Sequence, residues 1–406
     1  MSETRQLVIN DQLDMLNHLI AHQNAAIDLL ASDKRAELAT DLSLIAELVK
    51  NDELLEVMDY GDRINLAWAD GTNNYTLPFN LCHTETATLE DQESMNVADI
   101  EAHFVLPFDT VYDDPEAIFA SANDLSVGDY YFKIVNDAWG GNNGKYVCFT
   151  LSETLTAGKQ IRKKSGAYNA DISNCTLGIF ASGADRTGTE LAFTVNTTQP
   201  SSGTDLGQTD GTGDCNYWHC VVLGYNRWKY SAIRQYLNSS ATAGNWWTQQ
   251  HKWDVKPAYA DTKNGFLAGF DSELLKYMQV TKVVTARNTV FNSGDTLGGM
   301  DETYDRVFLA SLEQTYLTQQ ISGEGDYWEY YKRLLGRTTP APTGQTYARL
   351  IKYDLVSQTA PRYRWLRSAS RGDATNVWYI TTSGYVGNLN GASYGYRVAP
   401  CLRIGL

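Results

Sequence analysis

The sequence lacks any apolar run long enough to span a bilayer, and its 406 residues include only 9 Pro, 6 Cys, 6 His and 6 Met. A membrane-spanning helix needs about 20 consecutive apolar residues, so no segment predicts membrane insertion. Residues 1–11 also lack the basic, apolar and small-residue regions that make up a signal peptide. We therefore expect a protein that is made in a cytoplasm and stays soluble.

Basic residues are also few: the sequence has 33 Lys and Arg and 48 Asp and Glu, which give a net charge of -15. A nucleic-acid-binding protein neutralises phosphates with a clustered basic surface. The sequence therefore argues against a nucleic-acid partner. An acidic surface is instead typical of a soluble particle.

The few cysteines have no regular spacing, so the sequence predicts reduced, buried thiols rather than a disulfide framework. They are Cys82, Cys148, Cys175, Cys215, Cys220 and Cys401. Cys215, His219 and Cys220 are potential zinc ligands, but their spacing is not that of a zinc knuckle and no second ligand pair follows. No metal site is predicted there.

Residues 6–58 have the periodicity of a helix, with a break near residues 31–34. Apolar residues recur at steps of three or four: Leu13, Leu16, Ile20, Ile27, Leu30, Leu38, Leu42, Ile45 and Leu48. One interpretation is a short trimeric coiled coil that assembles copies of the protein, with Gln23 at a seam position. The other is a helical hairpin that packs on its own domain. Residues 1–58 are predicted to be the oligomerisation or attachment region.

The pattern changes to β structure from Asp59. Alternating residues around Asp70 and Gly71 predict a hairpin, and we assign residues 59–123 to a β-rich domain. Further strands are predicted up to about residue 196. Residues 124–196 are assigned to a second domain that resembles a β-sandwich.

Residues 197–214 form the clearest linker, since they are rich in Gly, Ser, Thr and Asp. Eight of the ten Trp follow residue 215, which favours a fold of loops held by aromatic packing. Helices are predicted at residues 231–237 and 305–316, and a third is predicted to end at Gly336. Residues 215–406 are assigned to a C-terminal domain.

Residues 362–406 are the most informative stretch, because they are rich in Tyr, Ser, Asn, Gly and Thr between apolar and Arg-containing ends. Tyr provides a large amphipathic contact area at low entropic cost, while Ser, Asn and Gly provide adaptable hydrogen bonds. Binding surfaces that adapt to many ligands have this composition. The tract therefore predicts a ligand-binding surface.

The motif LRSASRGDATNVWYITTSGYV, followed by YRVAP, resembles the variable region of target proteins of diversity-generating retroelements in phages and prophages of gut bacteria. Upstream motifs (NRWKYSAIRQYLNS, NGFLAGF, YDRVFLASLEQTY and GEGDYWEYYKRLLG) extend the resemblance over residues 215–406. The resemblance implies a C-type-lectin-like C-terminal fold, shared with formylglycine-generating enzymes. The predicted fold class is α+β and multidomain, with N-terminal helices, central β-rich domains and this C-terminal fold.

In such systems AAY codons of a template are copied with errors at adenine, so Lys, Glu, Gln, Met, Trp and stop codons cannot arise. Residues 368–406 contain no Lys, Glu, Gln or Met, and their one Trp, Trp378, corresponds to the fixed framework. An ordinary Gly-rich β region could lack those residues through composition alone. The pattern therefore agrees with the mechanism that the resemblance implies.

The resemblance places ligand-binding, variable residues within about 366–406. They are Ser370, Gly372, Asp373, Thr375, Asn376, Tyr379, Thr381, Tyr385, Gly387, Asn388, Leu389, Asn390, Ser393, Tyr394 and Tyr396. Scaffold positions are Leu366, Val377, Trp378, Ile380, Val386, Pro400 and Leu402, while Arg367 and Arg397 are expected to anchor loops. The alternative is an ordinary Gly-rich hairpin whose tyrosines pack inward. Val398 stands where the family more often has a cysteine, so no pairing with Cys401 carries over.

Other motifs predict less. Arg371, Gly372 and Asp373 spell an integrin-recognition triplet, which three residues form readily by chance. The acidic residues Asp301, Glu302, Glu324 and Asp326 could bind a structural calcium ion, but a solvated acidic face is the preferred interpretation, and no metal or cofactor is predicted. His83, His103, His219 and His251 have no Ser or Cys partner motif. We therefore expect no enzyme.

Two functions remain as hypotheses. The first is a phage structural protein on the virion surface, which displays the variable domain and binds a bacterial cell-surface protein or glycan as a receptor-binding adhesin. Its N-terminal region would contact other virion proteins as a homo-oligomer. The second is a capsid decoration or head-fibre protein with a mainly structural or weakly glycan-adhesive role.

Overall fold

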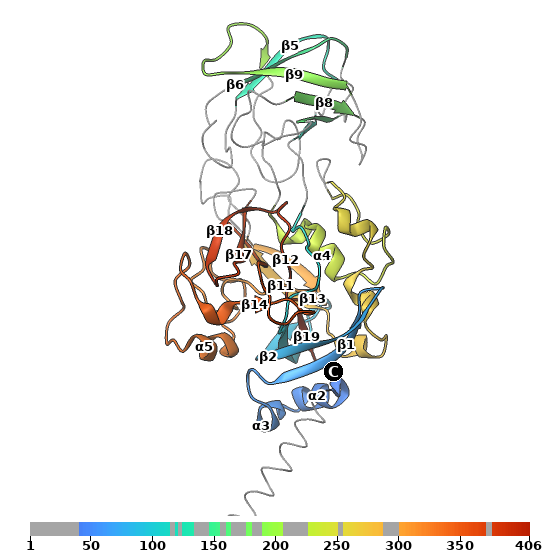
Figure 1. Ribbon diagram of the computed structural model, residues 1–406, viewed down its shortest axis with the longest axis vertical. Coiled ribbons are helices and arrows are strands. Elements are labelled where there is room, and N and C mark those ends of the chain that lie inside the picture. The colour runs from blue at the N-terminus through green and yellow to red at the C-terminus, as the bar shows by residue number, and fades with distance from the viewer. Residues whose placement is uncertain are drawn as a thin grey trace, which may run out of the picture.

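The computed structural model describes residues 40–113, 118–120, 124–133, 146–154, 160–163, 176–180, 189–205, 226–250, 255–286, 300–370 and 376–406 (Figure 1). The predicted coiled-coil seam at Gln23 and the predicted break at residues 31–34 lie outside these ranges. The same holds for residues 206–225, which include the second half of the predicted linker and Cys215, His219 and Cys220.

A five-stranded antiparallel sheet is the centre of the main body, with strand order β1-β2-β3-β19-β13. Its strands are β1 (Arg63–Ala69), β2 (Asn74–Thr88), β3 (Ser94–Ala102), β19 (Cys401–Ile404) and β13 (Val307–Phe308). The predicted hairpin is confirmed: β1 and β2 pair around Asp70, whose Oδ1 accepts hydrogen bonds from the backbone N–H groups of Thr72 and Asn73. Gly71 has a φ of +89° in this turn, a conformation that favours glycine.

The C-terminal strand inserts between β3 and β13. Cys401 lies opposite Glu101, and Leu402 lies opposite both Ile100 and Val307. One buried cluster continues from Leu42 to Ile404. Residues 59–102 and the C-terminal segment, which the sequence analysis assigned to different domains, are therefore parts of the same sheet and core.

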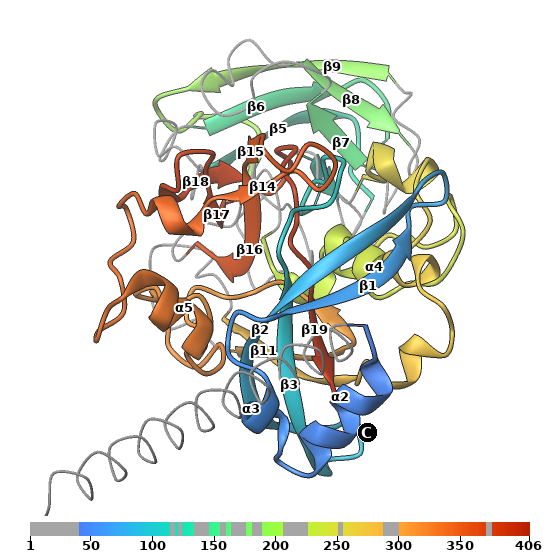
Figure 2. The ribbon, with the colours of Figure 1, turned by 60° about the horizontal axis from the view of Figure 1, so that its bottom comes forward.

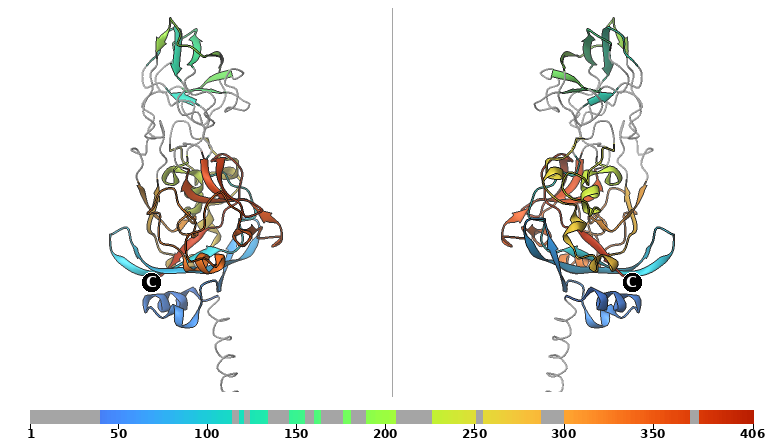
Figure 3. Two further views of the ribbon diagram at one scale, coloured as in Figure 1. Left: turned by 90° about the vertical axis from the view of Figure 1, so that its left-hand side faces the viewer. Right: turned by 90° about the vertical axis from the view of Figure 1, so that its right-hand side faces the viewer.

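Two short helices, α2 (Leu42–Lys50) and α3 (Leu54–Val57), pack on this sheet. Asp41 caps α2, since its Oδ1 accepts hydrogen bonds from the N–H groups of Ser43 and Leu44. Leu42, Ile45 and Ala46 are at most 1% exposed. Figure 3 shows these helices on the face of the sheet opposite the rest of the main body. In residues 42–57, the apolar stripe thus packs on the protein's own sheet.

A seven-stranded sheet forms the end of the molecule away from α2 (Figure 1). Its order is β10-β5-β6-β9-β8-β7-β4, from β4 (Ile118–Ala120), β5 (Gly128–Lys133), β6 (Tyr146–Leu151), β7 (Gln160–Lys163), β8 (Thr176–Phe180), β9 (Thr189–Asn196) and β10 (Thr204–Asp205). The described strands make one sheet, whereas the sequence predicted a sandwich. β10 lies within the predicted linker and pairs in parallel with β5.

Short helices and strand pairs complete the fold. The helices are α4 (Ala232–Leu237), α5 (Glu329–Leu335) and the 3-10 turns η2 (Trp228–Tyr230), η3 (Ala258–Asp261), η4 (Phe266–Gly269), η5 (Leu274–Lys276) and η7 (Ala348–Leu350). The strand pairs are β11 (Thr281–Ala286) with β12 (Met300–Asp305), and β14 (Lys352–Tyr353) with β15 (Pro361–Arg362). The predicted helices at 231–237 and before Gly336 are confirmed; Gly336 ends α5 with a φ of +65°.

The predicted helix at residues 305–316 is wrong. Val307 and Phe308 pair with the C-terminal strand instead, and the following residues form turns. Ser311 and Gln314 stabilise a turn, since the Ser311 N–H donates to Gln314 Oε1 (3.2 Å) and the Gln314 N–H donates to Ser311 Oγ (3.0 Å). Side-chain bonds of this kind compete with helical ones.

The protein is thus an α+β, strand-rich protein whose strands are mostly antiparallel. Among the helices of the described ranges, none has the length and apolar character needed to cross a membrane.

Candidate ligand-binding surface

The predicted variable region forms a three-stranded antiparallel sheet of β16 (Arg364–Ala369), β17 (Asn376–Ile380) and β18 (Val386–Gly391) (Figure 2). The middle strand β17 is buried along its whole length, as is β16. The scaffold prediction agrees with this burial, because Leu366, Val377, Trp378, Ile380, Val386, Pro400 and Leu402 are all buried. Side chains that can reach a ligand therefore come from β18 and the neighbouring turns.

The predicted binding residues differ widely in exposure. Tyr385, Leu389 and Tyr394 are 37%, 61% and 46% exposed. Asn388, Asn390, Ser393 and Tyr396 are half-buried, whereas Ser370, Asn376, Tyr379, Thr381 and Gly387 are buried. Gly372, Asp373 and Thr375 lie outside the described residues. Among the described residues of the set, the accessible ones are thus centred on β18 and the turns beside it.

An aromatic cluster lies beside these exposed residues. The ring centroid of Tyr396 is 4.8 Å from that of Tyr363, 5.5 Å from that of Tyr379 and 4.5 Å from that of Trp365. The ring of Tyr394 continues the cluster at 6.2 Å from Tyr396. Packed rings of this kind present a rigid surface to a ligand.

Tyr363 belongs to this surface although the sequence analysis did not select it. It is 37% exposed and stacks on both Tyr379 and Tyr396. It immediately precedes β16, outside the variable tract. Its place in the Tyr-rich stretch 362–406 is the sequence signal that could have identified it.

Hydrogen bonds within the predicted set hold its polar residues in place. Asn388 Nδ2 donates to Ser370 Oγ (3.0 Å), and Asn390 Nδ2 donates to the hydroxyl of Tyr396. Thr381 Oγ1 accepts from the Tyr385 N–H (3.0 Å). These hydrogen bonds fix the side chains before a ligand binds. A surface that is preorganised in this way loses less conformational entropy on binding.

The hydroxyls of Tyr379 and Tyr396 remain neutral at physiological pH. Burial, followed by the neighbouring Tyr385 and Tyr363, raises the pKa of Tyr379. Burial, together with Tyr379, Tyr363 and Tyr394, raises the pKa of Tyr396. The cluster accordingly offers uncharged hydroxyls that can donate and accept hydrogen bonds.

Buried arginines anchor the strands behind this surface. Arg367 Nη1 donates to the backbone oxygen of Leu309 (2.9 Å) and Nη2 donates to that of Val284 (3.1 Å). Arg397 Nη1 donates to the backbone oxygen of Leu106 (2.9 Å) and lies 3.2 Å from Asp354 Oδ2. Both arginines thus join loops that are distant in sequence, as the sequence analysis expected.

A third arginine joins β16 to the central sheet. Arg364 Nη1 lies 2.8 Å from Glu101 Oε1, and Lys352 Nζ lies 2.9 Å from Glu101 Oε2. Glu101 is wholly buried, and although burial opposes its ionisation, the charges of Lys352 and Arg364 outweigh that effect and lower its pKa. The paired charges fix β16 against β3.

The cysteines and acidic residues that the sequence analysis considered are also partly described by the structure. Cys82 and Cys401 are buried thiols, and burial raises the pKa of each. Asp301 is buried and forms an ion pair with Arg227 at 2.8 Å. Glu324 is also buried, so the interpretation as a solvated acidic face is wrong for Asp301 and Glu324, whereas Glu302 and Asp326 are exposed.

Comparison with known proteins gives one match. Residues 210–406 match the family model described as a domain of unknown function, DUF6273. Searches of curated proteins and of solved structures found no match. The match covers the C-terminal segment, which contains α4, α5 and the three-stranded sheet.

Proposed function

We propose that this protein is a phage structural protein whose C-terminal segment is a variable, C-type-lectin-like domain that binds a bacterial cell-surface protein or glycan. Binding occurs by contact, without turnover. One observation carries the proposal: three predicted variable residues, Tyr385, Leu389 and Tyr394, are exposed around a sheet whose framework residues are buried.

The mechanism is the presentation of changeable side chains on a fixed framework. Side chains at exposed positions of β18 and its turns can change with little effect on the core, since substitutions at exposed sites usually change stability by less than about 0.5 kcal/mol. Arg364, Arg367 and Arg397 hold the framework through buried contacts that leave those positions untouched. Such a surface tolerates diversification.

The lectin-like fold is supported by the way in which the C-terminal segment is built. Much of it consists of loops, short helices and strand pairs packed around Trp228, Trp328 and Trp365, each at most 1% exposed. Aromatic packing of this kind was the sequence argument for the fold.

Residues 1–58 are assigned to attachment and self-assembly in this proposal. Figure 1 shows β17 and β18 at the end of the main body opposite α2 and α3. The exposed residues Tyr385, Leu389 and Tyr394 form what we call the β18 surface. A chain attached to other virion proteins near α2 would hold this surface away from the attachment point, on the side of the main body that faces the seven-stranded sheet. In a homo-oligomer, repeated weak contacts with a cell surface would add through effective concentration.

The test of the proposal begins with the DNA around the gene. We expect a near-repeat of codons 366–406 beside a reverse-transcriptase gene, with differences almost confined to the adenines of the repeat. Such a repeat would establish diversification of the selected positions. Its absence, together with an unchanged tract in sibling isolates, would contradict the proposal and favour the capsid-decoration role.

A binding measurement then distinguishes the two roles. The purified protein should bind intact cells of the phage host and not cells of a resistant isolate that has lost the receptor. Equal binding to both cell types would favour weak glycan adhesion by a decoration protein. Localisation by immunogold labelling should place the receptor-binding protein at the tail tip.

A further inference from the structure

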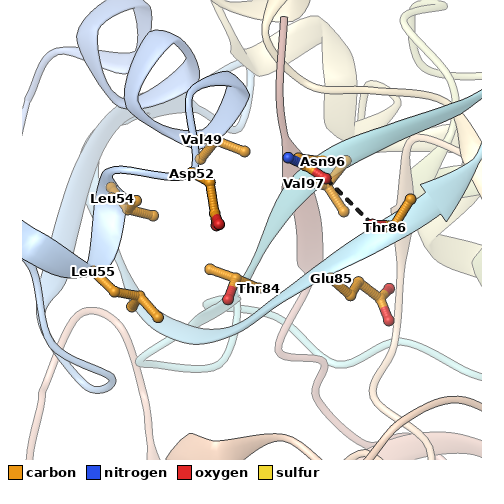
Figure 4. A pocket seen from close by; sticks show the side chains of 9 residues that line it. All are labelled: Val49, Asp52, Leu54, Leu55, Thr84, Glu85, Thr86, Asn96 and Val97. Carbon is orange, nitrogen blue, oxygen red and sulfur yellow. Dashed lines mark hydrogen bonds between the residues drawn. The ribbon is translucent and has the colours of Figure 1, made fainter.

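Three potential metal ligands meet between β2 and the loop before α5. His83 and Glu85 lie two residues apart on β2, so their side chains project from the same face of the strand. Asp326 comes from the loop before α5, and one potential ligand atom from each residue lies within 4.8 Å of the others. Figure 4 shows Glu85 extending from β2 away from Val49 and Asp52.

Two buried polar atoms at this place lack hydrogen-bond partners. One is Nδ1 of His83, and the other is Oδ2 of Asp99. Asp99 is wholly buried and lies directly opposite His83 in the pairing of β2 with β3. Burial of a polar atom without a partner is unfavourable, so Nδ1 of His83 points to a group that completes the site.

The cluster also has more negative than positive charge. Arg403 Nε donates to Asp99 Oδ1 (2.8 Å), and its Nη2 pairs with Glu85. Lys282 is nearby but forms an ion pair with Glu302 at 2.6 Å. The guanidinium of Arg403 therefore contacts the carboxylates of both Glu85 and Asp99.

A cavity of about 200 Å³ borders the cluster. Its lining includes Glu85, Asp326 and Arg403, and the two glycines that flank Glu324. Since Asp326 is exposed, the cavity communicates with solvent. Water can therefore reach the cluster and fill coordination positions that the protein leaves open.

We propose that His83, Glu85 and Asp326 bind a divalent first-row transition metal ion such as zinc. One imidazole with two carboxylates suits such an ion, whereas calcium prefers oxygen ligands alone. Asp99 and Arg403 act outside the ligand set: Arg403 holds Glu85 and Asp99 in place, and the metal offsets the excess negative charge. The ion joins β2 to the loop before α5 and so stabilises the contact between the N-terminal strands and the C-terminal segment.

Asp326 provides the cleanest test, because it is exposed and its replacement leaves the core intact. The full-length protein, stripped of metal with a chelator, should bind one Zn²⁺ per chain in isothermal titration calorimetry. Asp326→Asn and His83→Ala should each weaken that binding by at least about tenfold. Glu93→Gln, an exposed change in the turn between β2 and β3, is the matched control and should bind as the unmodified chain does.

Two further measurements separate this site from other zinc-binding groups. Co²⁺ bound here should give visible absorption bands without the thiolate charge-transfer band that cysteine ligands produce. Zn²⁺ should raise the melting temperature of the unmodified chain and not that of Asp326→Asn. Failure of the chain to bind Zn²⁺, Co²⁺ or Mn²⁺, or unchanged binding by Asp326→Asn, would overturn the proposal and indicate a proton shared by Glu85 and Asp99.

Discussion

A Cβ atom added at Gly387 would lie 2.7 Å from the hydroxyl oxygen of Tyr379. It would also lie 2.9 Å from Cε1 of Tyr385. The absence of a side chain at residue 387 therefore permits the packing of two tyrosines that belong to the same predicted ligand-binding set. The side chains of Tyr379 and Tyr385 therefore limit which residues residue 387 can accept.

Gly387→Ala should consequently destabilise the protein by about 1–3 kcal/mol, the usual cost of overpacking. The effect should shrink when Tyr379 is also changed to Ser, because the smaller side chain leaves room for the methyl group. Chemical denaturation of the two single variants and the double variant gives the coupling free energy. Strictly additive effects would show that the contact imposes no constraint.

Tyr385→Ala and Tyr394→Ala should weaken binding to host cells with a change in melting temperature of no more than about 2 °C, since both side chains are partly exposed. Thermal unfolding and cell-binding titrations check the two parts separately. A large loss of melting temperature would instead assign these tyrosines to the core.

Leu389→Ala should also weaken binding to host cells, because a 61% exposed leucine on β18 is available for contact with a ligand. Leu55→Ala is its matched control: this leucine is 46% exposed but lies on α3, at the opposite end of the main body. Equal losses of binding in the two variants would place the binding surface elsewhere.

Glu101→Gln should cost about 3–5 kcal/mol of stability, because it leaves Arg364 and Lys352 buried without their carboxylate. Glu302→Gln is the comparison, since it removes the partner of Lys282 in a more exposed ion pair and should cost at most about 1 kcal/mol. Urea denaturation of both variants measures the difference. Similar costs would show that Glu101 is not an essential partner of the buried cations.

His103 should make stability depend on pH. Burial, followed by the charges of Lys352 and Arg63, lowers its pKa from 6.5 to about 4. Between these pH values the unfolded chain binds a proton that the folded chain does not bind, so this contribution is fully present above pH 6.5 and is lost as the pH falls to 4.

Because the His103 side chain is only partly buried, the effect should be about 1–2 kcal/mol. Chemical denaturation at several pH values measures it, and His103→Asn should show a shallower fall over this window. Parallel curves for the two proteins would exclude His103 as the origin of the pH dependence.

Local features of the fold could be predicted from the sequence. Asp70 and Gly71 identified the first hairpin, Ser231 the start of α4 and Gly336 the end of α5, because turns and helix ends depend on short-range backbone geometry. The burial of framework residues such as Val377 and Leu402 was likewise predicted.

Long-range pairing could not be predicted in the same way. No local pattern indicates that Leu402 lies opposite Ile100, or that Val307 and Phe308 form a strand rather than a helix. A strand that is buried on both faces also lacks the alternation of apolar and polar residues that tells ligand-facing residues from core residues. The strand β17 is an example: all of it is buried, including Tyr379, which the sequence analysis had assigned to the ligand-binding set. The candidate metal cluster brings together residues 83 and 326, which only the folded chain shows.

The position of β19 inside the central sheet also has a consequence for protein synthesis. While residues 401–404 are still within the ribosome, β3 and β13 lack the neighbour that joins them. A product that stopped anywhere in the Tyr-rich tract would expose two unpaired strand edges, which invite aggregation and proteolysis. Residues 401–404 are therefore needed to close this sheet, and a chain that lacks them should give less soluble protein than the full chain.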